Sequence, residues 1–306
     1  MQFLKTTSLF LIVNLAIMAT IGFIIKALHL EPLLSGYGVN YFFLLGFCLF
    51  WGMGGAFISL LLSKTMAKWT MGLHVIDPNT ASYEERQLLN TVYALCHKAG
   101  LREMPEVGYY ESNELNAFAT GPSKNNALIG VSSGLLNRMN QKEVEGVLGH
   151  EIAHITNGDM VTMTLIQGVV NAFAMFLARV VARLLTATGR DEDNRSNNTI
   201  LEFFIRMILE IIFNILGSIV VCWFSRYREY RADEGGARYA GKQSMINALQ
   251  ALKNQHAFVE EGENASSAGL NTLKISNNRG GFLSLFTTHP PLDDRIERLK
   301  ANRNLM

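Results

Sequence analysis

The sequence predicts a mainly α-helical membrane protein that also contains a small β-sheet. Hydrophobic residues make up 49% of the chain, and they are gathered in blocks instead of being spread at the spacing of a soluble core. Two blocks are long enough to cross a bilayer without interruption, and two more carry a few polar residues. The segments between the blocks show short helical and strand patterns, which are typical of a soluble α/β part.

The first two blocks predict transmembrane helices. Ser8 to Ile25 is apolar except for Asn14, and Tyr41 to Leu62 contains no charged residue. Each reaches the roughly 20 residues that a helix needs to cross the hydrocarbon layer. The first block is too long for the apolar core of a signal peptide, and no small-residue cleavage pattern follows it. We therefore expect it to be kept as an anchor.

The third and fourth blocks, Met160 to Leu185 and Glu202 to Phe224, predict a hairpin of membrane helices. Both contain polar residues: Gln167, Asn171, Arg179 and Arg183 in the third, and Arg206, Glu210 and Asn214 in the fourth. Gln167 and Asn171 are four positions apart, as are Arg206 and Glu210. Residues with this spacing share a helix face and can point towards protein. This pattern favours a membrane hairpin over two buried helices of a soluble core.

The distribution of lysines predicts the orientation in the membrane. Lys5 precedes the first block, and Lys64 and Lys68 follow the second, whereas the turn between them has Lys26 near its start. By the positive-inside rule, the N-terminus and the segments after Lys64 lie in the cytoplasm. Two arginines in the connection from Thr186 to Thr199 disfavour its translocation, so a hairpin that enters the bilayer only in part is the alternative to a full span.

Charge and cysteine content exclude several classes of function. The formal net charge is +1 and no run of basic residues occurs, which excludes a nucleic-acid partner. The three cysteines, Cys48, Cys96 and Cys222, have no spacing typical of a disulfide framework or of a cysteine metal site. We expect each to be a free, buried thiol.

The segment from Asp77 to Arg138 predicts a soluble α/β piece. Glu84 to Lys98 has the periodicity of a helix, and Glu106 to Tyr110 and Ala127 to Val131 have the composition of short strands. We interpret Ala127 to Val131 as a core strand. The alternative is an edge strand to which an extended peptide adds by main-chain hydrogen bonds.

Helical patterns also occur nearer the end of the chain. Asn140 and Glu143 predict a capping box at the start of a helix, and Ser225 to Tyr239 predicts a second helix. Phe258 to Gly281 is rich in Gly, Ser and Asn and predicts a mobile loop, and Leu292 to Ala301 predicts a short closing helix. The predicted organisation has four parts in chain order: a membrane anchor (1–64), a soluble part (65–161), a membrane hairpin (162–225) and a second soluble part (226–306).

Residues 150 to 154 form a His-Glu-x-x-His signature on the helix that the capping box begins. His150 and His154 are four positions apart, so both imidazoles face one point, and Glu151 lies beside that point. The signature predicts one Zn²⁺ bound by the two histidines, with Glu151 taking a proton from a metal-bound water. Two structural histidines on a helix face are the alternative.

Zinc held by two histidines needs a third protein ligand. A third histidine six positions after the second is ruled out, because Met160 stands there. A carboxylate from another helix remains, and Glu229, Asp233 and Glu234 follow the predicted hairpin. Glu229 and Asp233 are four positions apart, so one can bind the metal while the other accepts a hydrogen bond from a ligand histidine.

Two polar residues follow the signature by one helical turn. Asn157 and Asp159 either fasten a ligand histidine or end the helix around Gly158. We favour the helix end.

Four motifs together resemble the HtpX-type membrane zinc metalloproteases, bacterial relatives of the eukaryotic CAAX prenyl protease. They are His150 to His154, Ser225 to Asp233, His289 to Ile296, and Asn116 to Gly121. The resemblance covers essentially the whole chain, and the hydropathy plan with four segments agrees with it.

The resemblance implies a role for several residues. Glu229 becomes the third zinc ligand and Asp233 the carboxylate that holds a ligand histidine. His289 and Arg295 line the substrate cleft and donate to the oxyanion, and Asn116 anchors the substrate backbone. From the residues alone, His289 could equally be a fourth ligand or a loop residue before two prolines, and Arg295 a solvated helix residue.

The resemblance also implies a function. The fold is a thermolysin-like zincin domain on a polytopic membrane protein, in the bacterial cytoplasmic membrane with its active site facing the cytoplasm. The expected activity is a zinc endopeptidase that cleaves damaged or misassembled membrane proteins for quality control. Its expected partners are unfolded polypeptides and the lipid bilayer. A prenyl-protein processing enzyme and a scaffold with a vestigial metal site are the alternatives, and polar residues flanking the signature disfavour an intramembrane-cleaving protease.

Overall fold

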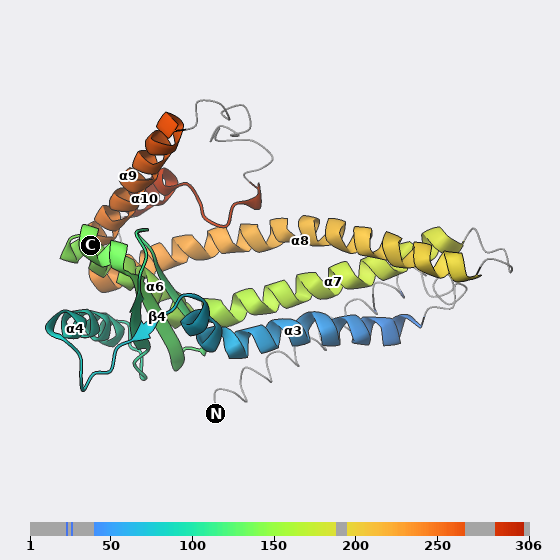
Figure 1. Cartoon of the computed structure of the whole chain (residues 1–306), viewed down its shortest axis with the longest axis horizontal. Helices are drawn as coiled ribbons and strands as arrows, with labels where there is room; N and C mark the ends of the chain where they lie inside the picture. Colours follow the sequence, from blue (N-terminus) through green and yellow to red (C-terminus); the bar gives the residue numbers. More distant parts are fainter. Residues whose placement is uncertain (1–22, 24–25, 27–39, 188–194, 267–284, 303–306) are drawn as a thin grey trace. The chain divides into compact units, whose positions relative to one another are not determined.

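The computed structural model describes residues 23, 26, 40–187, 195–266 and 285–302 (Figure 1). They form two compact units. The helical unit comprises the described residues of Met1–Leu60 and Val161–Val221, and the mixed unit comprises those of Leu61–Met160 and Cys222–Met306.

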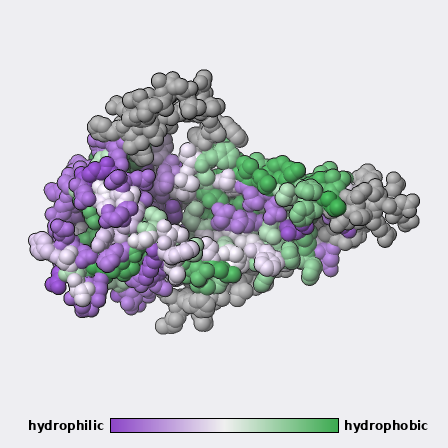
Figure 2. Space-filling model, in the orientation of Figure 1, coloured by the Kyte–Doolittle hydropathy of each residue, from purple (hydrophilic) through white to green (hydrophobic). Residues whose placement is uncertain are grey.

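Three long helices contribute to the helical unit: α3 (Tyr41–Thr70), α7 (Asp159–Ala187) and α8 (Arg195–Ala240). Within the described ranges, these three are long and apolar enough to cross a membrane, which confirms the second, third and fourth predicted blocks as helices. The first predicted block, Ser8 to Ile25, lies outside the described residues except for Phe23. Many large apolar side chains of the three helices are exposed, as the green surface of Figure 2 shows, and a bilayer would cover them.

Small residues let α3 and α7 approach each other closely. A Cβ atom added at Gly52 would lie 2.6 Å from the backbone nitrogen of Ala172, and one added at Gly168 would lie 3.2 Å from Cα of Met53. In lipid, where apolar burial between helices gives little stabilisation, this kind of close packing holds helices together.

Polar residues of the third and fourth blocks pair between helices. Arg183 Nη1 lies 3.4 Å from Glu202 Oε2, and Arg179 Nη1 lies 3.9 Å from Glu210 Oε2. Arg206 stacks over an aromatic ring of its own helix. Charged groups inside a membrane protein are expected to face one another in this way.

The mixed unit contains a four-stranded sheet in the order β1-β2-β4-β3. The strands are β1 (His74–Val75), β2 (Glu106–Tyr110), β3 (Ala117–Ser123) and β4 (Asn126–Ser132). β2 and β4 are parallel, and the other two pairs are antiparallel. β3 is therefore an edge of the sheet.

Both predicted strands are present, and the structure adds two that the sequence analysis did not predict. β4 lies between β2 and β3, so the core-strand interpretation of Ala127 to Val131 is confirmed. The composition of β3, which includes Gly121 and Pro122, is not typical of a strand. The strand passes through them because its register with β4 shifts between Thr120 and Ser123, where Gly121 has φ 144°.

Two predicted helices, α4 (Tyr83–Lys98) and α6 (Gln141–Asn157), pack against one face of the sheet. Their buried residues share a core with alternate residues of β2 and β4, as the period of two in a strand requires. The predicted capping box of α6, between Asn140 and Glu143, is confirmed. All three cysteines are free and buried, as predicted.

The end of the chain differs from expectation in two places. The predicted helix from Ser225 to Tyr239 is the last part of α8, which continues without a break for 46 residues. α9 (Lys242–Ser266) includes residues 258–266, so the prediction of a loop there is wrong, and the rest of that predicted loop lies outside the described residues. The predicted closing helix is α10 (Leu292–Ala301).

Candidate metal centre

The helix α6 brings two imidazoles together. Nε2 of His150 and Nε2 of His154 lie 3.1 Å apart, and both residues are buried. The spacing of four residues on one helix face produces this pair, as the sequence predicts.

Helix α8 passes close enough to α6 to add two carboxylates. A Cβ atom at Gly236 would lie 2.9 Å from the backbone nitrogen of His150, and one at Gly235 would lie 2.5 Å from Cβ of Ala153. Because neither glycine has a side chain, the helices touch along this line. Asp233 and Glu229, about one and two turns before the contact, are thereby buried beside the histidines.

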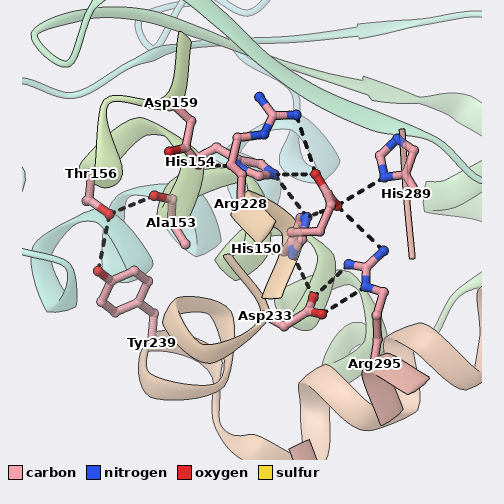
Figure 3. A network of polar contacts seen from close by, with 11 residues as sticks. His150, Ala153, His154, Thr156, Asp159, Arg228, Asp233, Tyr239, His289 and Arg295 are labelled. Atoms are coloured by element: carbon pink, nitrogen blue, oxygen red, sulfur yellow. Dashed lines mark hydrogen bonds and ion pairs between the residues drawn. The ribbon is translucent and has the colours of Figure 1, made fainter. Parts of the chain in front are cut away.

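Each histidine has a carboxylate at its Nδ1. Asp233 Oδ1 lies 3.0 Å from Nδ1 of His150, and Asp159 Oδ2 lies 2.6 Å from Nδ1 of His154 (Figure 3). These partners favour a proton on each Nδ1, a tautomer assigned here from the neighbouring carboxylates. Each Nε2 atom then carries a lone pair, and the two atoms face each other at 3.1 Å. This arrangement is stable only when a cation or a proton lies between the two nitrogens.

Glu229 completes a set of three donors. Its Oε2 lies 3.4 Å from Nε2 of His150, and its Oε1 lies 3.5 Å from Nε2 of His154. Around a tetrahedral ion with bonds of 2.0–2.1 Å, ligand atoms are about 3.4 Å apart. Glu229 Oε2 is also buried without a hydrogen-bond partner among the described residues. His150, His154 and Glu229 therefore fit a small divalent metal ion.

Arg295 is buried beneath the site instead of being solvated. Its Nε donates to Asp233 Oδ2 at 2.8 Å and its Nη2 donates to Asp233 Oδ1 at 2.6 Å. The helix α10 is held there because Ile296 and Leu299 pack against α8 and α9. The bidentate pair fixes the carboxylate that contacts His150.

His289 is the exposed member of the cluster. Its Nδ1 lies 3.1 Å from Glu229 Oε2, and 63% of its side chain is accessible. Arg226 Nη1 donates to the backbone oxygens of Leu285 and Thr287, which ties the segment before His289 to α8. An accessible imidazole next to three buried donors is where a substrate can meet the site.

The carboxylates and imidazoles of the site stabilise one another's charged forms. Burial alone would raise the pKa of Glu229, but the adjacent imidazoles of His150, His154 and His289 hold it well below its usual range. Burial alone would lower the pKa of His150, but the Asp233 and Glu229 carboxylates raise it to about 9. Without a metal ion, the cluster therefore holds a proton at neutral pH in the place where a cation fits.

Two other predicted site residues are Glu151, on α6, and Asn116, next to β3. Glu151 follows His150 on α6. Burial lowers the pKa of Arg295, but carboxylates that include Glu151 raise it, so Glu151 lies within electrostatic range of that side chain. Asn116 immediately precedes β3, and Ser132 on β4 bonds both its backbone N–H and its C=O.

Asp159 and Arg226 are site residues that the sequence patterns did not predict as such. The predicted helix end is present, because Gly158 ends α6 in a left-handed conformation with φ 72°. That turn also directs the Asp159 carboxylate onto His154. Helix end and histidine contact are therefore both correct, and a carboxylate directly after a C-terminal glycine is the signal that could have predicted the contact.

Comparison with known proteins identifies the family. Residues 82–303 match the model of peptidase family M48. The chain belongs to peptidase family M48. This M48 chain is 47% identical over 302 residues to a protein named Protease HtpX homolog from Methylacidiphilum infernorum, with 97% of this chain and 98% of the relative covered. It is 46% identical over 304 residues to the Protease HtpX homolog of Bacillus subtilis, with 97% and 99% covered.

The M48 chain is thus an HtpX-type protease, a membrane metalloprotease, as the sequence resemblance indicated. The crystal structure of Ste24p from S. mikatae has the same fold, with a TM-score of 0.60 at 17% sequence identity over 97% of this chain and 67% of that one.

Proposed function

We propose that this M48 protease is a zinc endopeptidase whose protein ligands are His150, His154 and Glu229. The observation that carries the proposal is the spacing of their donor atoms, 3.1, 3.4 and 3.5 Å, which suits a tetrahedral ion. Two imidazoles and one carboxylate are a donor set that zinc prefers and that leaves a fourth position for water.

A zinc ion bound there would supply a Lewis acid that lowers the pKa of water at the site towards about 7 and polarises the scissile carbonyl. The chain's own residues then move the protons. Glu151 accepts a proton from the attacking water and returns it to the leaving amine. Asp233 and Asp159 hold the imidazoles of His150 and His154 in the tautomer that binds metal.

His289 and Arg295 are proposed to donate to the substrate oxyanion, His289 from the accessible side of the site and Arg295 from its buried side. An accessible imidazole 3.1 Å from Glu229 can donate to the oxyanion that forms on the peptide carbonyl. Arg295 Nη1 lies 3.6 Å from Glu229 Oε2, and its other nitrogens are committed to Asp233, so its contribution to the oxyanion comes from Nη1.

The edge of the sheet provides a place for an extended substrate. β3 is one of the two outer strands, so main-chain groups along it can pair with a peptide. Asn116 lies at the start of this strand, where we propose that its side chain anchors the backbone of the substrate.

We propose that the substrates are damaged or misassembled membrane proteins, cleaved at segments on the cytoplasmic side of the bacterial inner membrane. The lysines that follow α3, Lys64 and Lys68, support a cytoplasmic position for the polar segments after them. A protease with several candidate membrane helices can meet such substrates in the bilayer.

Zinc content and casein hydrolysis of purified variants test this proposal. Glu151→Gln should keep one zinc ion and lose hydrolysis, and Glu229→Ala should lose zinc. Glu145→Gln on α6 and Glu234→Ala on α8 are matched controls that should keep both. Stoichiometric zinc with full activity in Glu229→Ala would show that the third ligand is wrong, and full activity in Glu151→Gln would show that the base is wrong.

A second assay separates the substrate classes. A prenylated peptide and an unfolded membrane protein with a cytoplasmic tail are offered to the same preparation. Faster cleavage of the unfolded membrane protein supports quality control, and cleavage of the prenylated peptide alone would favour a processing enzyme.

A further inference from the structure

The helical unit contains a polar cavity between its three long helices. Its volume is about 310 Å³. All three helices contribute residues to its lining. They include Trp51, Gly52 and Gly55 from α3, Asn171 from α7, and Glu210 and Asn214 from α8. None of them belongs to the metal centre.

This cavity lies near the middle of each apolar segment. Asn171 is 12 residues from both Asp159 and Arg183, which is about 18 Å of helix on either side. Gly52 likewise lies midway between the start of α3 and Lys64. A hydrocarbon layer is about 30 Å thick, so the polar groups of the cavity lie well inside it.

Polar groups at this depth are costly unless they have partners, and they usually mark a functional site. Arg179 Nη1 lies 3.9 Å from Glu210 Oε2, which is longer than a hydrogen bond, and the two side chains are 19% and 34% accessible. Asn214 Nδ2 donates to the backbone oxygen of Glu210, and Asn171 Oδ1 accepts from Gln167. The carboxylate of Glu210 keeps acceptor capacity towards the cavity.

On α3, Gly52 and Gly55 add no side chain to the cavity wall beside Trp51. A Cβ atom added at Gly52 would meet Ala172, whereas one added at Gly55 would meet nothing within 4 Å. Gly52 thus packs the helices, and Gly55 leaves space. Small residues that leave room beside a polar group allow another membrane helix to approach closely.

We propose that this cavity binds a membrane-spanning helix of a substrate protein through a hydrogen-bond donor side chain, with Glu210 as the acceptor. The proposal rests on the proposed function in the membrane. In a correctly assembled membrane protein, polar side chains face the bundle interior, so an unassembled one presents them to lipid. A donor such as Asn or Lys, left without its own partner, is complementary to the Glu210 carboxylate.

Two single-span reporters in proteoliposomes test it. Both carry the same unfolded cytoplasmic tail, and their leucine-rich spans differ by one central residue, Asn or Leu. The readout is the ratio of the two tail-cleavage rates within each variant. The wild type should cleave the Asn reporter about three- to tenfold faster, as expected for one hydrogen bond between membrane helices.

Gly55→Leu, which fills the cavity, should bring the ratio to about one, and Glu210→Gln should lower it. Gly46→Leu is the matched control on α3, since a Cβ atom there also meets nothing within 4 Å and Gly46 does not line the cavity, so the ratio should remain. Zinc content of each variant reports folding. Equal rates for both reporters in the wild type, or a preserved ratio in Gly55→Leu, would overturn the proposal.

Failure of the proposed activity would look different, because neither tail would be cleaved. Photocrosslinking of the reporters to the Glu151→Gln protein then tests the cavity without catalysis. Stronger crosslinking of the Asn span that disappears in Gly55→Leu supports the cavity, and equal crosslinking of both spans contradicts it.

Discussion

Asp159 Oδ2 lies 2.6 Å from Nδ1 of His154, although Gly158 ends the helix between the two residues. The left-handed glycine turns the chain back on the last turn of α6, and this directs the carboxylate at the imidazole. A carboxylate at this position fixes the ring and makes its Nε2 a better donor to a metal.

Asp159→Asn should weaken zinc binding by about 10- to 100-fold, because a neutral amide holds the imidazole less firmly and makes it less basic. Competition with a fluorescent chelator at pH 7 measures the affinity. Asp294→Asn, an exposed carboxylate on α10, is the control and should bind zinc like the wild type. Equal zinc affinity in both variants would show that Asp159 does not support metal binding.

Arg295→Met should destabilise the zinc-free protein by about 3–5 kcal/mol, because Asp233 would be left buried without its bidentate partner. Thermal unfolding in detergent measures the change. Arg298→Met, on the same helix, removes an exposed ion pair to Glu234 and should cost less than about 1 kcal/mol. The double variant Asp233→Asn/Arg295→Met removes the unpaired charge as well, and it should recover part of the lost stability. Equal melting of both single variants would show that the buried pair does not support the fold.

Zinc affinity should rise with pH. Two carboxylates outweigh burial and raise the pKa of His150 to about 9, so the metal-free protein holds a proton there below this pH and loses it above. Zinc has to displace that proton, and its apparent affinity should increase about tenfold per pH unit between pH 7 and 8 and level off above 9. In Asp233→Asn the plateau should begin at lower pH. A flat profile in the wild type would contradict the proposed ligand.

His289→Ala should lower kcat by about 10²–10³ while zinc stays stoichiometric, because one donor to the oxyanion is lost and the buried ligands are not. Casein hydrolysis and metal analysis on the same sample check both parts. His97→Ala, an exposed histidine on α4, should leave both unchanged. Loss of zinc in His289→Ala would instead make His289 a ligand.

Local rules were enough to predict several features from the sequence. The pairing of His150 and His154 depends on helix periodicity alone, and the start of α6 depends on the capping box between Asn140 and Glu143. The membrane helices follow from the length of their apolar segments. Each of these needs information from residues that are close in the sequence.

Contacts between distant segments required the tertiary structure. From the residues alone, either Glu229 or Asp233 could face the metal; the packing of α8 on α6 puts Glu229 at the two Nε2 atoms and Asp233 at Nδ1 of His150. The burial of Arg295 depends on α10 packing against α8 and α9, which no local pattern encodes. The strand β3 forms through pairing with β4, despite its glycine and proline. The sequence by itself determined the apolar helices, the start of α6 and the pairing of the two histidines, because those depend on short-range geometry. Only the fold decided what surrounds the histidines, because that depends on how closely separate helices can approach.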